Sequence, residues 1–189
     1  MTIAQLRTRA AGCRECDLFR DATQTVFGTG AEHARVLLVG EQPGDREDRA
    51  GEPFVGPAGR LLDEALSDAG IDRDSLYITN AVKHFRFEER GKRRIHKRPN
   101  RGQIRACHPW LDAELATVAP EVVVCLGAVA AESLLGKDFR LTERRGERIE
   151  MDGRVYMATI HPSAVLRAKD RDEMYAGLVA DLRAAAPSR

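Results

Sequence analysis

The sequence predicts an α/β fold of three layers, in which helices cover both faces of a central, mainly parallel sheet of about four strands. Two observations carry this prediction. Short apolar runs, such as Val36 to Val39 and the stretch PEVVVCLG at residues 120–127, have the length of buried strands and end in glycine. Stretches with apolar residues at helical spacing lie between these runs, and strands that alternate with helices favour a parallel sheet.

Four segments predict the strands of this sheet. The run at 36–39 leads into the turn GEQPG, and the stretch SLYITNAV follows at 75–82. The third strand is the run at 120–127. The fourth is the second half of a hairpin that turns at Asp152–Gly153 and ends at His161.

Helices are expected where apolar residues recur on one stripe and a glycine ends the pattern. The clearest example has Leu61, Leu62, Ala65 and Leu66 on one face and stops at Gly70. The helices are expected at residues 56–70, 102–118, 128–136 and 172–186.

Composition indicates a soluble globular protein with one domain over residues 1–189. The chain is 43% hydrophobic and 31% charged, and no apolar run approaches the ~18 residues of a membrane span. Its first residues lack the apolar centre of a signal peptide. We therefore expect a cytoplasmic monomer without membrane contact.

Positive charge is concentrated in one segment. Residues 83–105 hold ten Lys or Arg and two Glu, a local charge of +8 in a chain whose net charge is +1. Glycine and proline within it predict a loop over about 86–102, with His96 in its middle. The segment is either a solvated loop or a contact for a polyanion such as DNA. The candidate DNA-binding cations are Lys92, Arg93, Arg94, Lys97 and Arg98.

Polar clusters follow the predicted strands, at the edge of a parallel sheet where ligands bind. They are GEQPG at 40–44, TNAVKH at 79–84 and HPS at 161–163. Glu41, Gln42, Phe54 and Asn80 offer a carboxylate, amides and an aromatic ring. The loop is not a phosphate loop, because it lacks Gly-Lys-Ser/Thr and carries acidic residues. It suits a flat, neutral, polar ring.

Taken together, these motifs resemble the uracil-DNA glycosylase superfamily. The order G-E-x-P-G, E-x-P-F-V-G-x-A-G-x-L-L, a strand ending in T-N and then H-P-S is similar to its iron–sulfur-containing, family 4-like group. Gln42 and the inserted KRRIH at 92–96 resemble the UdgX subclass, which excises uracil and becomes covalently attached to DNA. The resemblance extends over Cys13 to Arg167.

The resemblance implies a role for each motif residue. Phe54 would stack on a flipped uracil, Asn80 would pair with its edge, and Gln42, Pro43 and Gly44 would line the pocket. His161 would donate to the uracil oxygen on which negative charge develops. Glu41 would lie near the sugar, and His96 would be the covalent nucleophile. Uracil-containing DNA, including single-stranded DNA, would be the partner.

Cysteines suggest a metal site. Cys13 and Cys16 form a C-x-x-C pair, and Cys107 is a third candidate ligand. The resemblance implies a [4Fe–4S] cluster whose fourth ligand follows the T-N strand, where this chain has His84 instead of cysteine. Cys125 competes for that place but lies in an apolar strand, where cysteine is a small hydrophobic residue. Zinc also suits three cysteines and a histidine.

Three functions fit these observations. The first is a glycosylase that removes uracil and traps itself on the sugar through His96. The second is a turnover glycosylase in which His96 only contacts phosphate. The third is a non-catalytic binder of uracil-containing DNA.

Overall fold

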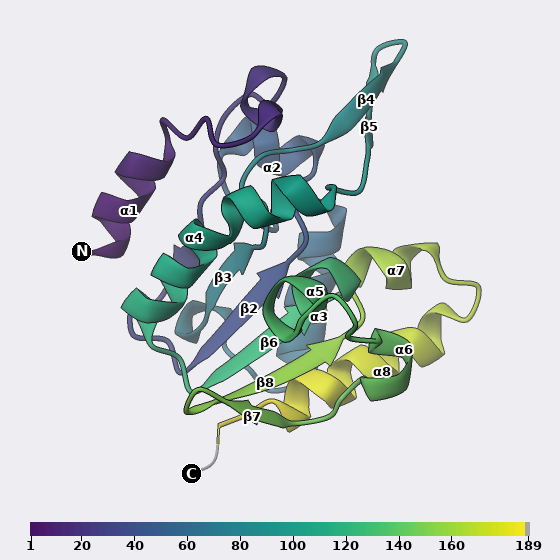
Figure 1. The fold of residues 1–189 in the computed structure, drawn as a ribbon. Coiled ribbons are helices and arrows are strands. Elements are labelled where there is room, and N and C mark those ends of the chain that lie inside the picture. The colour runs from purple at the N-terminus through teal and green to yellow at the C-terminus, as the bar shows by residue number, and fades with distance from the viewer. Residues whose placement is uncertain (188–189) are drawn as a thin grey trace.

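Residues 1–187 are described by the structure, a computed structural model, in which one sheet is covered by helices on both faces (Figure 1). The sheet has six strands in the order β1-β3-β2-β6-β8-β7. Its strands are β1 (Thr29–Gly30), β2 (Val36–Gly40), β3 (Tyr77–Asn80), β6 (Val122–Leu126), β7 (Ile149–Met151) and β8 (Arg154–Thr159).

The predicted fold class is confirmed, with a correction to the strand count. The four inner strands β3, β2, β6 and β8 are parallel, and the short β1 and β7 add an antiparallel strand at each edge. β1 has only two residues, too few to leave a periodic pattern in the sequence. β8 ends at Thr159, two residues before the His161 expected from the sequence, which leaves His161 outside the sheet.

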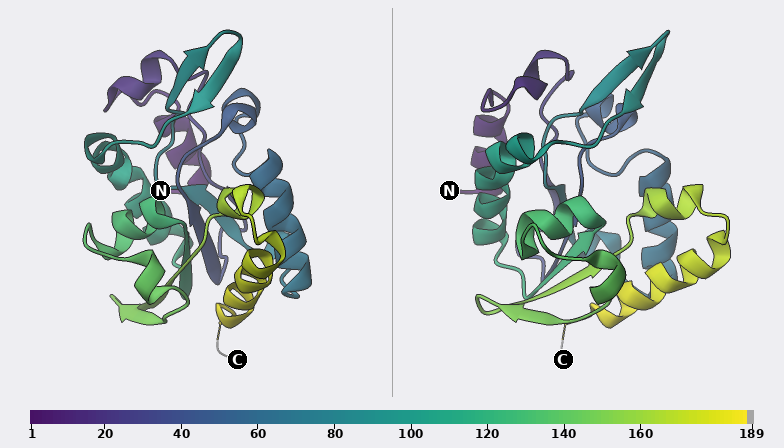
Figure 2. Two further views of the ribbon diagram at one scale, coloured as in Figure 1. Left: turned by 90° about the vertical axis from the view of Figure 1, so that its right-hand side faces the viewer. Right: turned by 45° about the vertical axis from the view of Figure 1, so that its right-hand side comes forward.

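Helices form two layers, one on each side of the sheet (Figure 2). Apolar residues of α1, α4 and α5 pack on one face, and those of α3, α7 and α8 pack on the other. The helices are α1 (Ile3–Ala10), α2 (Asp45–Ala50), α3 (Pro57–Asp68), α4 (Arg101–Val118), α5 (Ala128–Leu135), α6 (Leu141–Arg144), α7 (Pro162–Arg167) and α8 (Arg171–Ala184), with 3-10 turns at Asp17–Arg20 and Arg73–Ser75. No helix in residues 1–187 is long and apolar enough to cross a membrane.

The basic segment is a β-hairpin rather than the expected loop. Strands β4 (Phe87–Arg90) and β5 (Arg93–His96) pair antiparallel and project from the body of the molecule (Figure 1). Gly91 makes the turn possible, since its φ of +61° lies in the left-handed region. Charges at most positions hide the strand pattern in the sequence. The register pairs Phe87 with His96 and so fixes His96 at the base of the hairpin.

Candidate active site

The polar clusters predicted at the strand ends meet at the carboxyl ends of the parallel strands. Gly40 at the end of β2 pairs with Asn80 at the end of β3, and the backbone of Ala81 continues this pairing by donating to the Gly40 carbonyl at 2.9 Å. A cleft beside them is lined by Glu41, Gln42, His96 and His161 among others. A smaller cavity next to it is lined by Gln42, Gly44, Glu47, Phe54, Ala58, Asn80 and His161.

Asn80 is buried with an unsatisfied acceptor. Its side-chain Oδ1 has no hydrogen-bond partner within the described residues, although only 2% of the residue is exposed. A buried amide oxygen without a partner costs about 1–3 kcal/mol. That cost is recovered when a ligand places an N–H group against Oδ1. The cavity is therefore built for a ligand edge that carries a donor.

A buried ion pair holds the backbone of Asn80. Lys83 Nζ donates to the Asn80 carbonyl at 2.6 Å and pairs with Glu114 of α4 at 2.5 Å, and both charged side chains are fully buried. The Glu114 carboxylate also accepts from the Tyr77 hydroxyl and the Gly28 N–H. Lys83 belongs to the basic segment at residues 83–105 by sequence, yet it is buried in the structure. The pair spans 31 residues of sequence, so no local pattern reveals it.

Phe54 forms a wall of the small cavity in a strained backbone conformation. Its φ is +54°, unusual for a bulky side chain. The Glu47 carboxylate accepts from the N–H groups of Val55 and Gly56 and so holds the loop that carries it. A Cβ on Gly59 would lie 1.9 Å from the Phe54 carbonyl oxygen, so only glycine fits there. Sequence reasoning missed Glu47, because acidic residues are frequent in this loop.

His161 faces the Phe54 ring and has a defined tautomer. The ring centroids are 5.8 Å apart with an interplanar angle of 29°. The backbone N–H of Ser163 donates to His161 Nδ1 at 3.1 Å, so the proton of the neutral ring is on Nε2. Burial lowers the pKa of His161 to about 4, with Glu41 opposing that shift and His96 and Arg167 adding to it. At neutral pH, His161 is therefore an uncharged Nε2–H donor.

Gln42 joins the hairpin to the strand edge. Its amide nitrogen donates to the carbonyls of Arg86 and Lys97 at 3.2 and 2.9 Å, and its Oε1 accepts from the Arg86 N–H at 2.8 Å. These bonds bracket the two ends of the hairpin. The buried amide is thereby largely satisfied by protein, in contrast to Asn80.

His96 lies beside Glu41 at the mouth of the cleft. Its Nε2 is 2.9 Å from Glu41 Oε1, and half of the His96 side chain is exposed. The contact is close but not aligned as a hydrogen bond, and Oε1 has no such bond to any described residue. The fold thus brings the exposed His96 imidazole next to the Glu41 carboxylate, although the two residues are 55 positions apart in the sequence.

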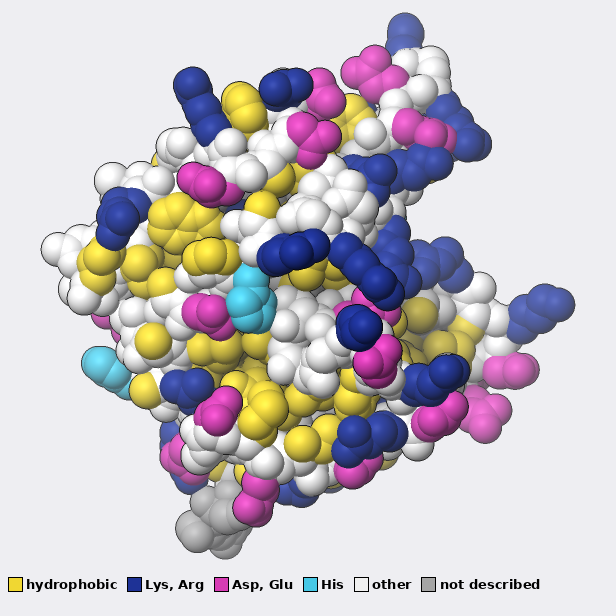
Figure 3. Space-filling model, viewed as in Figure 1, with side chains coloured by type: hydrophobic (Ala, Val, Ile, Leu, Met, Phe, Trp, Pro, Cys, Tyr) yellow, Lys and Arg dark blue, Asp and Glu magenta, His cyan; other side chains and the backbone are white. Residues whose placement is uncertain are grey.

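The five basic residues predicted to contact DNA divide into two groups. Arg94 is 12% exposed in its side chain and pairs with Asp45 at 2.5 Å and Asp48 at 2.6 Å, while its guanidinium lies over the rings of Phe85 and Phe87. Arg94 therefore attaches the hairpin to α2 instead of presenting charge to solvent, which corrects the sequence-based expectation. The other four, Lys92, Arg93, Lys97 and Arg98, are exposed. Lys and Arg side chains gather around the notch beside the hairpin (Figure 3).

Three predicted metal ligands surround a small region between the N-terminal segment and α4. The Lys83 N–H points to Cys107 Sγ at 3.4 Å, the Trp110 indole N–H points to Cys13 Sγ at 3.3 Å, and Cys16 packs against the apolar cluster of Cys107. His84 is buried, and its Nδ1 has no hydrogen-bond partner in residues 1–187. Three thiols and one unpaired imidazole nitrogen are donors of the chemical types that bind iron or zinc.

Two further observations bear on this donor set. No group of three or more His, Cys, Asp or Glu in residues 1–187 is close enough to hold a metal ion as the side chains stand. Cys125 is completely buried within β6 among apolar core residues, and burial raises the pKa of its thiol to about 12. Its surroundings are those of a small hydrophobic residue.

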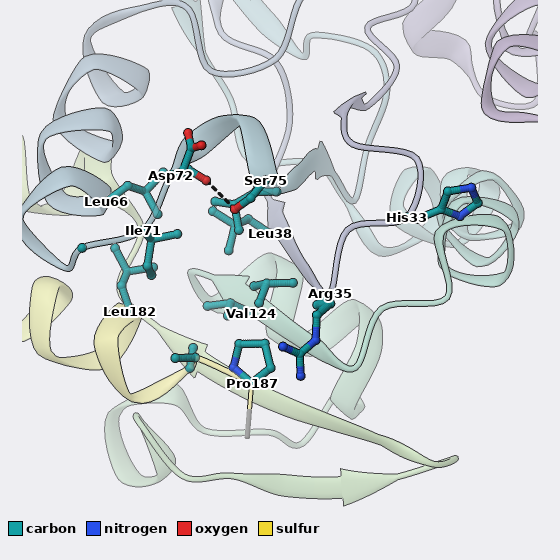
Figure 4. A pocket seen from close by; sticks show the side chains of 15 residues that line it. His33, Arg35, Leu38, Leu66, Ile71, Asp72, Ser75, Val124, Leu182 and Pro187 are labelled. Atoms are coloured by element: carbon teal, nitrogen blue, oxygen red, sulfur yellow. Dashed lines mark hydrogen bonds between the residues drawn. The ribbon is translucent and has the colours of Figure 1, made fainter. Parts of the chain in front are cut away.

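Another cavity lies at the opposite end of the strands (Figure 4). Val36, Leu38, Val124 and Leu182 line it, and the hydrogen bond drawn there joins the Ser75 hydroxyl to the Asp72 carbonyl at 2.6 Å. Its lining is mainly apolar, and the unsatisfied side-chain atoms found in residues 1–187 belong to Glu41, Asn80 and His84. Those three residues lie at or just after the carboxyl ends of β2 and β3, at the other end of the strands from this cavity.

The structure is that of an α/β protein with a polar cleft and a small buried cavity at the carboxyl ends of its parallel strands, beside exposed basic side chains. The chain belongs to the uracil-DNA glycosylase superfamily, because the family model described as Uracil DNA glycosylase superfamily matches residues 27–183. A type-4 uracil-DNA glycosylase of Thermotoga maritima is 36% identical over 166 residues, covering 87% of this chain and 83% of the relative.

Two other relatives agree with this assignment. A type-4 uracil-DNA glycosylase of Pyrobaculum aerophilum is 35% identical over 179 residues, covering 88% of this chain and 86% of the relative. A type-5 uracil-DNA glycosylase of the same organism is 32% identical over 152 residues, covering 71% of this chain and 63% of the relative. The family resemblance inferred from the motifs is confirmed at the level of the superfamily.

Proposed function

We propose that this protein excises uracil from DNA and captures the resulting abasic sugar covalently through His96, as in the UdgX subclass. The observation that carries the proposal is the position of His96, with Nε2 2.9 Å from Glu41 at the mouth of the cleft that adjoins the Asn80 cavity. A nucleophile there would meet the sugar of a base held in that cavity. A monomer acting on single-stranded DNA would be sufficient.

Recognition of uracil follows from the unsatisfied acceptor. Uracil carries N3–H, which would donate to Asn80 Oδ1, and the Asn80 amide N–H would donate to O4. Cytosine presents an acceptor at N3 and would leave Oδ1 unpaired. Phe54 would stack on the ring and, with its neighbours, leave no room for the methyl of thymine. The base must first leave the stack, at a cost of a few kcal/mol.

Cleavage of the N1–C1′ bond sends its electron pair to uracil. The neutral His161 ring can donate Nε2–H to the oxygen that gains charge, since its Nδ1 is occupied by Ser163. A donor fixed before the reaction stabilises the leaving anion without reorganisation. C1′ becomes electron-poor, and the Glu41 carboxylate provides negative charge on that side.

Capture requires a neutral imidazole. A His96 nitrogen lone pair would form the bond to C1′ as uracil departs, leaving a positively charged imidazole ring. Glu41, already in contact with His96, would offset that charge. The hairpin that carries His96 would also exclude water, which otherwise completes a turnover reaction.

The donor set of Cys13, Cys16, Cys107 and His84 would hold a [4Fe–4S] cluster. Such a group would supply a structural cross-link between the N-terminal segment, the end of β3 and α4. The unpaired Nδ1 of His84 supports its choice over Cys125, which lies in the apolar core. Iron and sulfide analysis of the purified protein tests whether the bound group is a [4Fe–4S] cluster, and zinc without iron would overturn that assignment. Cys125→Ser should leave the metal content unchanged.

Denaturing electrophoresis after incubation with a uracil-containing oligonucleotide tests the proposal. A DNA–protein band stable to SDS and heat supports capture, whereas abasic DNA without such a band supports turnover. Unchanged DNA indicates a non-catalytic binder. His96→Ala should still remove uracil but release abasic DNA, and a stable adduct in that variant would identify another nucleophile. Lys92→Ala at the hairpin tip is the matched control.

A further inference from the structure

A positively charged groove lies between α4 and α5, outside the cleft described above. Arg101, Arg105 and His108 line it from α4, and Ser133 and Lys137 line it from the α5 side. The α4 residues stand at spacings of four and three, which places them on one face of the helix. The groove is thus a defined surface, separate from the hairpin cations.

The lining cations of the groove are exposed, and the lining carboxylate, Glu132, is paired with Arg98. Arg101, Arg105 and Lys137 are exposed, and none makes an ion pair with another residue in the described part of the chain. Two like charges four residues apart on a helix destabilise it by about 0.2–0.5 kcal/mol. Folding does not favour this arrangement, whereas a bound polyanion would.

The groove is continuous with the cleft. Arg98 lines the cleft, Glu132 lines the groove, and the two side chains pair at 2.9 Å on the ridge between them. Lys and Arg side chains extend from the notch over the N-terminal part of α4 (Figure 3). A strand that leaves the cleft can therefore pass over this pair and enter the groove without crossing an unpaired acidic side chain.

We propose that the groove between α4 and α5 binds the phosphodiester backbone of single-stranded DNA on one side of the excised nucleotide. Arg101, Arg105 and Lys137 supply the charge, and the Ser133 hydroxyl and His108 are hydrogen-bonding groups in the same groove. The groove has no Phe, Tyr or Trp among its lining residues, which favours contact with the backbone over stacking of bases. This inference rests on the proposed function, because the strand is located by the base in the Asn80 cavity.

Three single-stranded oligonucleotides of one length test the proposal, with uracil in the middle, near the 5′ end or near the 3′ end. The stretches of DNA on the two sides of the uracil are its 5′ and 3′ arms. For the native protein, binding and uracil removal should be weaker when one of the two arms is short than when the other is. Arg105→Gln/Lys137→Gln should weaken binding to the middle-uracil DNA about tenfold at low salt. It should also lower the slope of log affinity against log salt by about 1.4. The same variant should be insensitive to the length of that one arm.

The matched control is Arg9→Gln/Arg183→Gln, which removes two exposed cations far from the cleft on α1 and α8, and it should bind as the native protein does. Binding is measured by fluorescence anisotropy on copies of the same oligonucleotides that carry 2′-fluoro-2′-deoxyuridine, which presents the same uracil base but resists cleavage, so that binding is read independently of the reaction. The proposal is overturned if the Arg105/Lys137 variant keeps the native salt slope and arm dependence, or loses affinity for duplex DNA only. Failure of the proposed function is distinct, because the native protein would then remove uracil from none of the three DNAs.

Discussion

Two walls of the same cleft are built in opposite ways. The base cavity is buried, with Asn80 and Phe54 only 2% and 5% exposed, and its supports are the Lys83–Glu114 pair and the Glu47 carboxylate. The hairpin opposite is a separate two-stranded sheet whose His96 side chain is 52% exposed. In the proposed function, selection of the base therefore belongs to the buried strand ends of the core, and capture belongs to an element attached to that core.

The hairpin depends on its attachments because two strands alone are marginally stable in water. Gln42 fixes its base, and Arg94 pairs it with α2. The small cavity at Asn80 and Phe54 is instead part of the core, so it is stabilised by the folding of the whole domain. Substitutions should therefore act differently on the two walls: at the cavity they should affect folding and excision together, and at the hairpin they should affect capture first.

Lys83→Met should have the largest effect. It leaves Glu114 charged and unpaired in the core, which costs about 3–5 kcal/mol, and it releases the Asn80 carbonyl. Urea unfolding monitored by circular dichroism gives the loss of stability. The double variant Lys83→Met/Glu114→Leu removes both charges and should recover part of it. A single variant as stable as the native protein would show that the pair does not support the cavity.

Gly40→Ala should disrupt the cavity with less effect on the fold. The added Cβ would lie 2.4 Å from Asn80 Oδ1 and 2.6 Å from Phe54 Cζ, so both walls must move. Overpacking of this kind costs about 1–3 kcal/mol, and the displaced amide should lower uracil removal at least tenfold. Single-turnover excision measures the effect. Gly12→Ala, whose nearest neighbour is 3.9 Å away, is the control and should excise normally.

Arg94→Met should impair the hairpin while leaving the buried cavity intact. Without its ion pairs to Asp45 and Asp48, the hairpin loses its contact with α2, and His96 is no longer held over Glu41. We expect at least a tenfold fall in the fraction of DNA captured, with abasic DNA still released. Denaturing gels and alkaline cleavage measure the two products. Arg93→Met, which removes an exposed neighbour, should keep capture, and equal loss in both variants would refute the attachment role.

The sequence could predict the buried wall better than the hairpin. Apolar runs identify β2, β3 and β6. The glycine-rich turn after β2 reveals Glu41 and Gln42, and Asn80 stands out as the polar residue at the end of β3. Lys83 and Arg94 show the limit of such signals. Each is a cation in a basic run, yet one is buried and the other ion-paired, and their partners Glu114 and Asp45 lie 31 and 49 residues away. Only tertiary structure distinguishes them from solvent-exposed charges.

The smallest expected effect is a pH dependence confined to the buried wall. The pKa of His161 falls from about 6.5 in the unfolded chain to about 4 in the folded protein, chiefly through burial. Between these two values the unfolded chain binds more protons, so the stabilisation is complete above pH 6.5 and decreases as the pH falls towards 4. Since His161 keeps some contact with solvent, we expect a loss of about 1–2 kcal/mol between pH 7 and pH 5.

His161→Gln isolates this contribution, because the other titrating groups remain. Urea unfolding at pH 7 and pH 5 should show a smaller loss of stability for the variant than for the native protein. His33→Gln, which removes an exposed histidine at the far end of the strands, should keep the native difference. Identical pH dependence in the native protein and His161→Gln would mean that His161 titrates normally. The His161 Nε2–H group that is proposed to donate to the uracil oxygen would then belong to a partly charged imidazole near pH 6.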